Sequence, residues 1–354
     1  MFFSRLRLLL LPFSWLYGLI MVVRNLLFDF KLLKSVRYPF PVISVGNITV
    51  GGTGKTPLAE YIIGLIGSFN HVALLSRGYG RQTKGVLFAN SSSTYLDIGD
   101  EPLQIKQKFD NLTVVVAEKR VKGMECLTDL SFPPSVVVMD DAYQHRYVSA
   151  GLSILVCDYN RPLWSDYTFP AGNLREPRQG KKRSDIVIVN KCPIDFTKNE
   201  AVEVQDKLRL RSNQHLFFTA IKYGEPLRLD GKERGENSFR RALEKQGFFI
   251  VAFAGIGNPS PFFDMVDKYA DKLVTMRYRD HYRYREEDLS VIEKAGEGRA
   301  LYVTTEKDGV RLKSLKGITS KEASRIWYFP VEPFFLFNRG AQFDKLVKDY
   351  VGTD

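Results

Sequence analysis

The chain has 354 residues, which at about 150 residues per domain predicts two domains. Hydrophobic residues make up 44% and charged residues 26%, which excludes a disordered chain, and the net charge of +11 favours nucleic acid, an anionic membrane surface or a phosphorylated substrate as partner. The three cysteines form no CxxC pair, which excludes a disulfide scaffold and a cysteine zinc site and predicts three buried thiols in a reducing compartment.

Residues 1–40 are expected to form a membrane-associated helical segment. This segment contains one acidic residue, Asp29, and six basic residues, namely Arg5, Arg7, Arg24, Lys31, Lys34 and Arg37. The uncharged stretch from residue 8 to residue 23 is shorter than the ~20 residues of a spanning helix, and Pro12 is expected to interrupt it. No small-residue cleavage site follows, so we do not expect a removed signal peptide. The composition favours an amphipathic or partly inserted helix on anionic head groups, with a buried core helix as the alternative.

Short β-branched runs after residue 40 predict an α/β fold. Near-continuous apolar runs are typical of parallel strands covered by helices on both faces. The predicted strands are Val42–Val45, Val72–Leu75, Val114–Val116, Val136–Met139, Ile154–Cys157, Ile186–Val189, Phe248–Phe253 and Leu301–Thr304. The polar stretch Lys198–Asn213 is taken as the boundary region. We therefore expect a P-loop core with a mostly parallel sheet at 41–213 and a smaller α/β domain at 214–354 that closes a cleft.

The first predicted strand leads into a glycine-rich turn, then Lys55-Thr56, then an apolar helix. This order is typical of a phosphate-binding P-loop, in which backbone N–H groups and a helix N-terminus hold the phosphates. Lys55 would reach the β- and γ-phosphates, and the Thr56 hydroxyl would bind Mg²⁺. Thr49 stands where the usual pattern has glycine. The predicted nucleotide-binding residues are Thr49, Val50, Gly51, Gly52, Thr53, Gly54, Lys55 and Thr56.

Two acidic pairs are candidates for the chemistry beside this loop. Asp140 and Asp141 end a predicted buried strand, where the acidic metal ligand of a P-loop protein is expected, although such a pair can also cap a helix. Asp100 and Glu101 precede Pro102, a pattern that taken alone predicts only the first turn of a helix.

Two of the four histidines also lie in polar clusters. His145 follows the acidic pair at 140–141, and His281 lies in the stretch from Asp280 to Tyr284. A histidine beside a carboxylate can serve proton transfer, although a single histidine is more often structural. Asn190-Lys191 is similar to the base-reading NKxD motif of GTPases, but the next aspartate, Asp195, comes two positions too late. We therefore do not assign that pair to nucleotide binding.

Eight segments together resemble the tetraacyldisaccharide 4′-kinases, the lipid A 4′-kinases of Gram-negative bacteria. The resemblance extends from the N-terminal apolar stretch to about residue 315, and DDAYQHR departs mildly from the usual DDGFQHR at Ala142 and Tyr143. The segments are GNITVGGTGKTP (46–57), LLSRGYGR (74–81), GDEPLQI (99–105), DDAYQHR (140–146), FPAGNLREP (169–177), AFAGIGNP (252–259), RDHYRY (279–284) and TTEKDGVRL (304–312).

The resemblance implies transfer of the γ-phosphoryl group of ATP to the 4′-hydroxyl of a tetraacylated disaccharide 1-phosphate, with Mg²⁺ as cofactor. It implies Asp100 as base with His281 across the cleft, and Lys55 beside the transferring group. It also implies that the metal region holds Thr56, Glu101, Asp140 and Asp141, and that the acceptor region holds His145, Asn173, Arg175 and Glu176.

The implied acceptor is a glycolipid of the inner membrane, so the expected location is the cytoplasmic face of that membrane, as a peripheral or monotopic protein. The expected partners are the glycolipid and an anionic membrane surface, without nucleic acid, and the sequence leaves the oligomeric state open. A nucleic-acid ATPase would show basic-aromatic clusters near the sheet and no apolar N-terminus. A membrane-associated ATPase switch of partitioning type stays as the alternative, although it gives no reason for GDEP, NLREP and DHY.

Overall fold

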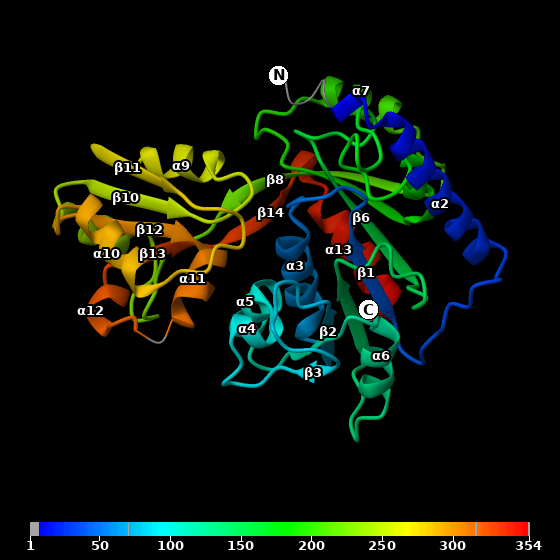
Figure 1. Ribbon diagram of the computed structural model, residues 1–354, viewed down its shortest axis with the longest axis horizontal. Helices are drawn as coiled ribbons and strands as arrows, with labels where there is room; N and C mark the ends of the chain where they lie inside the picture. Colours follow the sequence, from blue (N-terminus) through cyan, green and yellow to red (C-terminus); the bar gives the residue numbers. More distant parts are fainter. Residues whose placement is uncertain (1–6, 70, 316, 353–354) are drawn as a thin grey trace.

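Two sheets organise the computed structural model, which describes residues 7–69, 71–315 and 317–352 (Figure 1). Arg5 and the rest of residues 1–6 lie outside this range. Within it, the strands form one nine-stranded and one five-stranded sheet, here called the larger and the smaller sheet. Helices lie beside both sheets, and the predicted α/β class is confirmed.

The larger sheet is parallel except at its two edges, where β14 pairs with β8 and β3 pairs with β4 in antiparallel fashion. Its strands in spatial order are β14 (Val331–Phe335), β8 (His215–Tyr223), β7 (Ile186–Asn190), β6 (Leu152–Asp158), β1 (Val42–Gly46), β5 (Val136–Asp140), β2 (Val72–Ser76), β4 (Thr113–Val116) and β3 (Leu87–Phe88). The smaller sheet has the order β11 (Lys272–Arg277), β10 (Phe249–Ala254), β12 (Leu301–Thr305), β13 (Ile326–Phe329) and β9 (Leu227–Arg228), with β9 antiparallel.

Each apolar run predicted as a strand lies in a strand, with its bounds shifted by two residues at most. The physical reason is visible in β5, whose five residues are all buried. Val136 and Val138 pack into one apolar cluster, whereas Val137 and Met139 pack into another on the opposite face. A strand covered on both faces needs apolar residues at every position, which explains the continuous runs.

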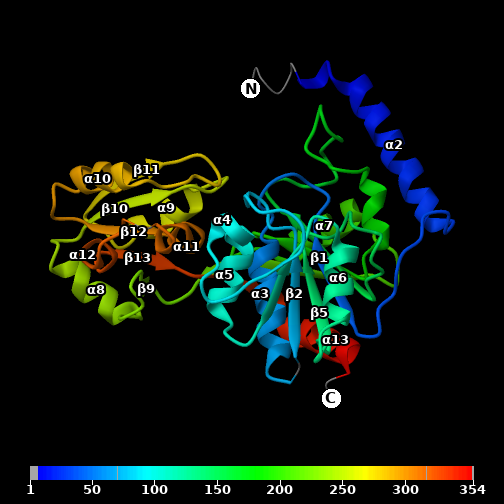
Figure 2. The ribbon, with the colours of Figure 1, turned by 60° about the horizontal axis from the view of Figure 1, so that its bottom comes forward.

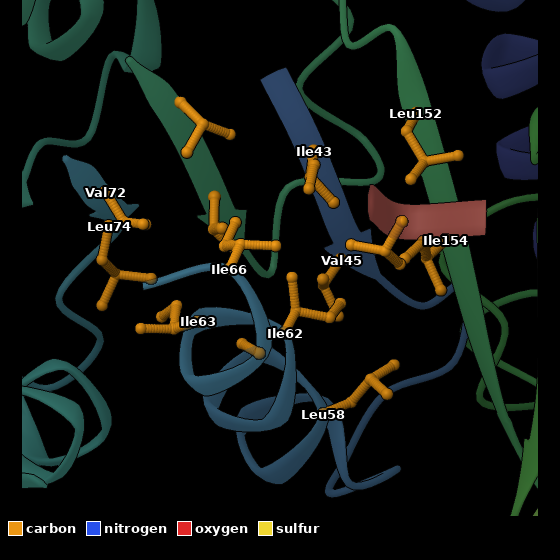
Figure 3. Packing of buried hydrophobic residues seen from close by; sticks show 14 of the residues in the cluster. Ile43, Val45, Leu58, Ile62, Ile63, Ile66, Val72, Leu74, Leu152 and Ile154 are labelled. Atoms are coloured by element: carbon orange, nitrogen blue, oxygen red, sulfur yellow. The ribbon is translucent and has the colours of Figure 1, made fainter. Parts of the chain in front are cut away.

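Helices cover both faces of the larger sheet. In Figure 3, Ile62 and Ile66 of α3 point toward Ile43 and Val45 of β1. On the other face α6 contributes Met124 and Leu127, and α7 contributes Val204 and Leu208. The helices are α2 (Leu11–Asp29), α3 (Lys55–Gly67), α4 (Tyr95–Ile98), α5 (Asp100–Lys108), α6 (Arg120–Thr128), α7 (Lys198–Leu208), α8 (Glu236–Glu244), α9 (Ser260–Asp267), α10 (Glu286–Ala295), α11 (Glu306–Lys313), α12 (Ser320–Ala323) and α13 (Gly340–Val351), with 3₁₀ turns η1 (Arg178–Arg183) and η2 (Leu336–Asn338).

The cysteines differ in part from their predicted burial. Cys157 of β6 and Cys192 are buried, and all three cysteines are free thiols, as expected. Cys126 lies on α6 and is only half-buried. Composition indicates how often a free cysteine is buried, but not which face of a helix carries it.

The two sheets do not divide the chain at residue 213. β8 begins at His215 but pairs with β7 in the larger sheet, and β14 returns from the smaller sheet to pair with β8. Phe343 and Val347 of α13 then pack in the same cluster as α3. The range 214–354 therefore joins the smaller sheet to two segments of the larger one, because apolar periodicity predicts a strand without indicating which sheet it enters.

Helix α2 lies on the outside of the larger sheet (Figure 2). Pro12 is in its first turn and does not interrupt it, because a proline there loses no helical hydrogen bond. Ser14 and Gly18 are buried, whereas Trp15 is 70% and Leu19 60% exposed. The alternative of a buried core helix is therefore wrong. In length and composition α2 is the one helix among the described residues that could cross a membrane.

Candidate active site

The P-loop connects β1 to α3, as its motif predicts. Gly54 caps α3 with a φ of +88°, and Gly51 has a φ of +101°, conformations that favour glycine. The buried Asn47 side chain donates to the Thr53 hydroxyl over 3.1 Å, which holds the loop in a tight turn. Thr49 does not have a positive φ, so its backbone does not require the glycine of the usual pattern.

The pair Asn190-Lys191, which we did not assign to nucleotide binding, supports the P-loop directly. The Asn190 side chain donates to the Thr53 carbonyl over 2.9 Å, and Lys191 donates to the Gly52 carbonyl over 2.5 Å. The carboxylate of Asp158 lies 2.8 Å from the Lys191 ammonium. These residues end β7 and β6, so the carboxyl ends of neighbouring parallel strands meet at the loop.

The segment 173–175 runs alongside the P-loop. The Val50 N–H donates to the Asn173 carbonyl over 2.8 Å, and the Arg175 N–H donates to the Ile48 carbonyl over 2.7 Å. The predicted acceptor segment and the predicted nucleotide loop therefore form one short antiparallel ribbon, with a bridge between Thr49 and Leu174.

Asp141 joins the P-loop lysine to this segment. Lys55 Nζ lies 3.4 Å from Asp141 Oδ1, and an Arg175 guanidinium nitrogen lies 3.2 Å from each carboxylate oxygen of Asp141. Burial opposes ionisation, but the two cations lower the pKa of Asp141 below its usual value. Asp141 is therefore an ionised carboxylate that forms ion pairs with both Lys55 and Arg175.

Asp140 is in the opposite situation. It is fully buried at the end of β5, and neither of its carboxylate oxygens has a hydrogen-bond partner among the residues that the structure describes. Burial and the charge of Glu101 raise the pKa of Asp140 to about 7. A buried carboxylate with two unpartnered oxygens is costly unless a cation is bound beside it. Of the predicted metal-region residues, Asp140 therefore fits a metal ligand best.

The structure brings Asp100 and His281 together, although 181 residues separate them. His281 Nδ1 lies 2.9 Å from Asp100 Oδ2, and Asp100 is buried in the first turn of α5. Burial disfavours its ionised form, but the His281 hydrogen bond and the charges of Lys307 and Arg311 hold the pKa of Asp100 far below its usual range. Asp100 is thus a carboxylate that shares its charge with three groups.

Two of these groups, Lys307 and Arg311, received no role from the sequence. Lys307 Nζ lies 3.0 Å from a Glu101 oxygen and 3.3 Å from His281 Nε2. Arg311 Nε donates to Asp100 Oδ2 over 3.0 Å. Both lie on α11, within the segment TTEKDGVRL, but their carboxylate partners Glu101 and Asp100 are more than 200 residues away in sequence. The four-residue spacing that places both on one face of the helix is the signal that could have paired them.

His145 and Glu176, the two other predicted acceptor residues, differ in the charges that surround them. Burial and the nearby positive charge of Arg120 lower the pKa of His145 to about 4, so its imidazole is neutral at pH 7. Glu176 is 1% exposed, and its oxygens accept hydrogen bonds from Arg183, Gln144 and Asn25. Asn25 belongs to α2, so Glu176 joins that helix to the core.

Asn173 and Arg175 also contact the N-terminal part of the chain. Arg7 donates to the Asn173 side-chain oxygen over 3.4 Å, and the Tyr17 hydroxyl donates to the Arg175 carbonyl over 2.7 Å. Asn173 and Arg175 are therefore half-buried between the P-loop and α2. This position lies between the nucleotide loop and the exposed apolar face of α2.

The family of the tetraacyldisaccharide-1-P 4′-kinases matches residues 6–351 of the chain. The tetraacyldisaccharide 4′-kinase of Flavobacterium johnsoniae is 40% identical over 346 residues, covering 98% of this chain and 97% of its own length. The tetraacyldisaccharide 4′-kinase of Parabacteroides distasonis is 39% identical over 358 residues, covering 98% and 95%.

A solved structure has a similar fold over almost the same length. The chain superposes on LpxK from Aquifex aeolicus, crystallised in complex with ATP, with a TM-score of 0.74 and 29% sequence identity. The match covers 98% of this chain and 99% of that one. Both sheets and the N-terminal helix are thus part of the shared architecture.

Proposed function

The chain belongs to the tetraacyldisaccharide-1-P 4′-kinase family, and on that premise we propose that it transfers the γ-phosphoryl group of ATP to the 4′-hydroxyl of a tetraacyldisaccharide 1-phosphate, a lipid A precursor. The observation that carries the proposal is the ribbon of residues 48–50 and 173–175, which joins the nucleotide loop to the acceptor segment. The ATPase switch of partitioning type is set aside, because the full-length relatives are named as kinases.

The P-loop residues 49–56 bind the ATP phosphates in this proposal. Backbone N–H groups of the loop and the N-terminus of α3 supply positive partial charge, and Lys55 adds a full charge at the β- and γ-phosphates. In the structure Lys55 lies against Asp141, so nucleotide binding would exchange one anionic partner for another. The loop's supports from Asn190 and Lys191 hold its shape during that exchange.

The donor set fits Mg²⁺ as cofactor. Among the described residues, no three His, Cys, Asp or Glu side chains form a ready-made metal site. Mg²⁺ commonly uses only one or two protein carboxylates together with phosphate oxygens. The unpartnered oxygens of Asp140 and the Thr56 hydroxyl are the first candidates, with Glu101 and Asp141 close by. When bound, the ion would neutralise charge on the phosphates.

Asp100 accepts the proton of the acceptor hydroxyl in this mechanism. A sugar hydroxyl is a poor nucleophile, and a positioned carboxylate removes its proton as the new bond to phosphorus forms. His281 Nδ1 orients the carboxylate through the 2.9 Å contact. Because α5 packs with the larger sheet and His281 follows β11 of the smaller one, the pair depends on both parts of the protein.

The acceptor approaches along α2. Tyr17 and Asn25 of α2, together with Arg7 shortly before it, contact residues 172–176, so a glycolipid held beside α2 would lie next to the acceptor segment. The exposed apolar side chains of α2 suit the acyl region of a bilayer, and its basic flanks suit anionic head groups. We infer a peripheral or monotopic protein on the cytoplasmic face of the inner membrane, where ATP is available.

Phosphorylation of the defined lipid tests the proposal. The protein is incubated with γ-labelled ATP, Mg²⁺ and tetraacyldisaccharide 1-phosphate in mixed micelles, and the lipid fraction is analysed for label. The expected product carries one added phosphate at the 4′ position, and an acceptor already phosphorylated there serves as control. ATP hydrolysis without labelled lipid would contradict the proposed kinase activity and would favour the ATPase switch of partitioning type instead.

A further inference from the structure

Arg311 is an almost fully enclosed cation beside Asp100. Its side chain is 2% exposed, and its Nε and Nη2 both donate to Oδ2 of Asp100. Its remaining terminal nitrogen, Nη1, donates to the Gly255 carbonyl over 2.9 Å and to Asp308 Oδ1 over 2.7 Å. Every terminal nitrogen of the guanidinium is therefore engaged, and none is directed to solvent.

Asp308 fixes this guanidinium from the other side. The Asp308 carboxylate accepts hydrogen bonds from the Gly255 N–H over 2.9 Å and from the Thr305 hydroxyl over 2.6 Å. It is fully buried within α11. The contacts with Gly255 and Asp308 therefore fix Arg311 within the part of the protein that holds the smaller sheet and α11. Its partner Asp100 begins α5, beside the larger sheet.

The two oxygens of Asp100 are loaded unequally. Oδ2 takes the two donors of Arg311 and Nδ1 of His281, and the Lys307 ammonium lies 3.8 Å from it. Oδ1 accepts one hydrogen bond, from the Glu101 N–H over 2.9 Å. Among the described residues Oδ1 thus has fewer donors than Oδ2, and it can still take a hydrogen bond from another group.

We propose that Arg311 is a positioning residue for phosphoryl transfer, which anchors Asp100 through Oδ2 and leaves Oδ1 for the acceptor hydroxyl. In the step that this serves, the acceptor oxygen forms a bond to the γ-phosphorus as the bond to the ADP oxygen breaks. The hydroxyl proton passes to Asp100 Oδ1, and Arg311 keeps its own protons. The inference rests on the proposed function, in which Asp100 is the base.

A two-nitrogen anchor from α11 also makes the base depend on the contact between the two sheets. If the smaller sheet moves away from α5 together with α11 and the loop that carries His281, Asp100 loses both Arg311 and His281, and the carboxylate is free to turn away from the acceptor. Misplacing a reacting group by about 1 Å can cost about 10²-fold in rate. Arg311 would thus restrict efficient transfer to the arrangement in which α11 rests on α5.

The test measures kcat and the KM for ATP of the full chain, using labelled ATP and micellar tetraacyldisaccharide 1-phosphate. Arg311→Ala is expected to lower kcat about 10²-fold with little change in the KM for ATP. Arg311→Lys should restore only part of the loss, because an ammonium cannot form the two-nitrogen contact. Lys313→Ala, at an exposed position of the same helix, should keep the wild-type kcat.

A double variant separates positioning from general damage. Arg311→Ala should lower kcat much less in an Asp100→Asn background than in the wild type, because its effect passes through Asp100. Millimolar guanidinium, far below denaturing concentrations, should restore part of the activity of Arg311→Ala. If Arg311→Ala does not fold, Arg311→Lys and Asp308→Asn decide instead, and both should lower kcat while ATP binding persists.

Two results would overturn the inference. One is a folded Arg311→Ala, or in its absence a folded Arg311→Lys and Asp308→Asn, with kcat within threefold of the wild type. The other is a loss in the Asp100→Asn background as large as in the wild type. Failure of the proposed function is distinguishable, because the wild-type chain itself would then leave the lipid unlabelled.

Discussion

His281 Nδ1 lies 2.9 Å from Asp100 Oδ2 and thereby connects a loop of the smaller sheet to a helix of the larger one. The imidazole also stacks edge-on against Tyr79, with 5.1 Å between ring centroids. Tyr79 follows β2 of the larger sheet, so His281 has two contacts across the gap between the sheets. His281 has a φ of +55°, which glycine would adopt more readily and which places its ring toward these partners.

Removal of Asp100 and removal of His281 should each lower kcat, and the loss should be larger for Asp100. Asp100→Ala is expected to lower kcat by about 10²–10⁴, the usual range for a general base, with little change in ATP affinity. His281→Ala should cost less, because Arg311 and Lys307 still hold the carboxylate. Steady-state kinetics of both single variants and the double variant would measure the effect. Losses that multiply fully in the double variant would show that the two residues act independently.

The P-loop variants should separate phosphate binding from folding. Lys55→Ala removes the charge at the β- and γ-phosphates, and Thr56→Ala removes a hydroxyl that would bind Mg²⁺, so both should nearly abolish phosphoryl transfer. Both side chains lie at the start of α3 outside the apolar core, so the thermal midpoint should change little. Lys122→Ala, an exposed lysine on α6, is the matched control. Near-normal transfer by either P-loop variant would refute this role of the loop.

The sequence predicted those features that are local in the chain. β1, β5 and the P-loop are contiguous patterns, and a strand buried on both faces has few alternatives to continuous apolar residues. β14 was not predicted, because Pro333 lacks a backbone donor and weakens a strand pattern. Its position at the edge of the larger sheet explains how a proline is tolerated there.

The site was predictable only in part. The residue pattern singled out Asp100 and His281 separately, but their pairing came from resemblance to a family, since nothing in the local sequence connects residues 181 positions apart. Arg311 is 211 positions from Asp100, and its role appears only when α11 is seen beside α5. Glu176 lies in a quoted motif, but its burial against Arg183 and α2 could not be inferred from composition.

A second contact between α11 and the larger sheet predicts a pH effect on stability. Lys108 Nζ lies 2.6 Å from a Glu60 oxygen and 2.9 Å from a Glu306 oxygen, so two carboxylates share one ammonium. Burial and the charge of Glu306 raise the pKa of Glu60 to about 7. The folded protein then binds this proton more tightly than the unfolded chain, in which the pKa of a glutamate is about 4.3.

The free energy of unfolding should therefore fall as the pH rises from about 4.3 to about 7, by at most about 4 kcal/mol from this group. Glu60→Gln removes this ionisation. The difference in thermal midpoint between the variant and the wild type should therefore shift in favour of the variant by a few degrees from pH 5 to pH 8. Calorimetry at both pH values checks this. Glu203→Gln, at an exposed position on α7, should show no such trend, and an equal trend in both variants would contradict the assignment.

The last prediction concerns attachment to membranes through α2. Deletion of residues 1–24 would test it poorly, because Tyr17 and Arg24 bond to Arg175 and Gln144, and their loss would disturb the acceptor segment as well. Trp15 and Leu19 are a better choice, since they are 70% and 60% exposed on the face away from that segment.

Trp15→Asp combined with Leu19→Asp should release the protein from phosphatidylglycerol-containing vesicles and leave its thermal midpoint nearly unchanged. Burial of each apolar side chain is worth about 1.5–3 kcal/mol, so the loss of both should weaken vesicle binding by at least about a hundredfold. The KM for the lipid acceptor should rise much more than the KM for ATP, because only the lipid is presented by the membrane. Phe132→Asp, at an aromatic residue 84% exposed far from α2 in sequence, controls for added charge alone. Vesicle co-sedimentation that stays at the wild-type level in the double variant would show that α2 is not the anchor.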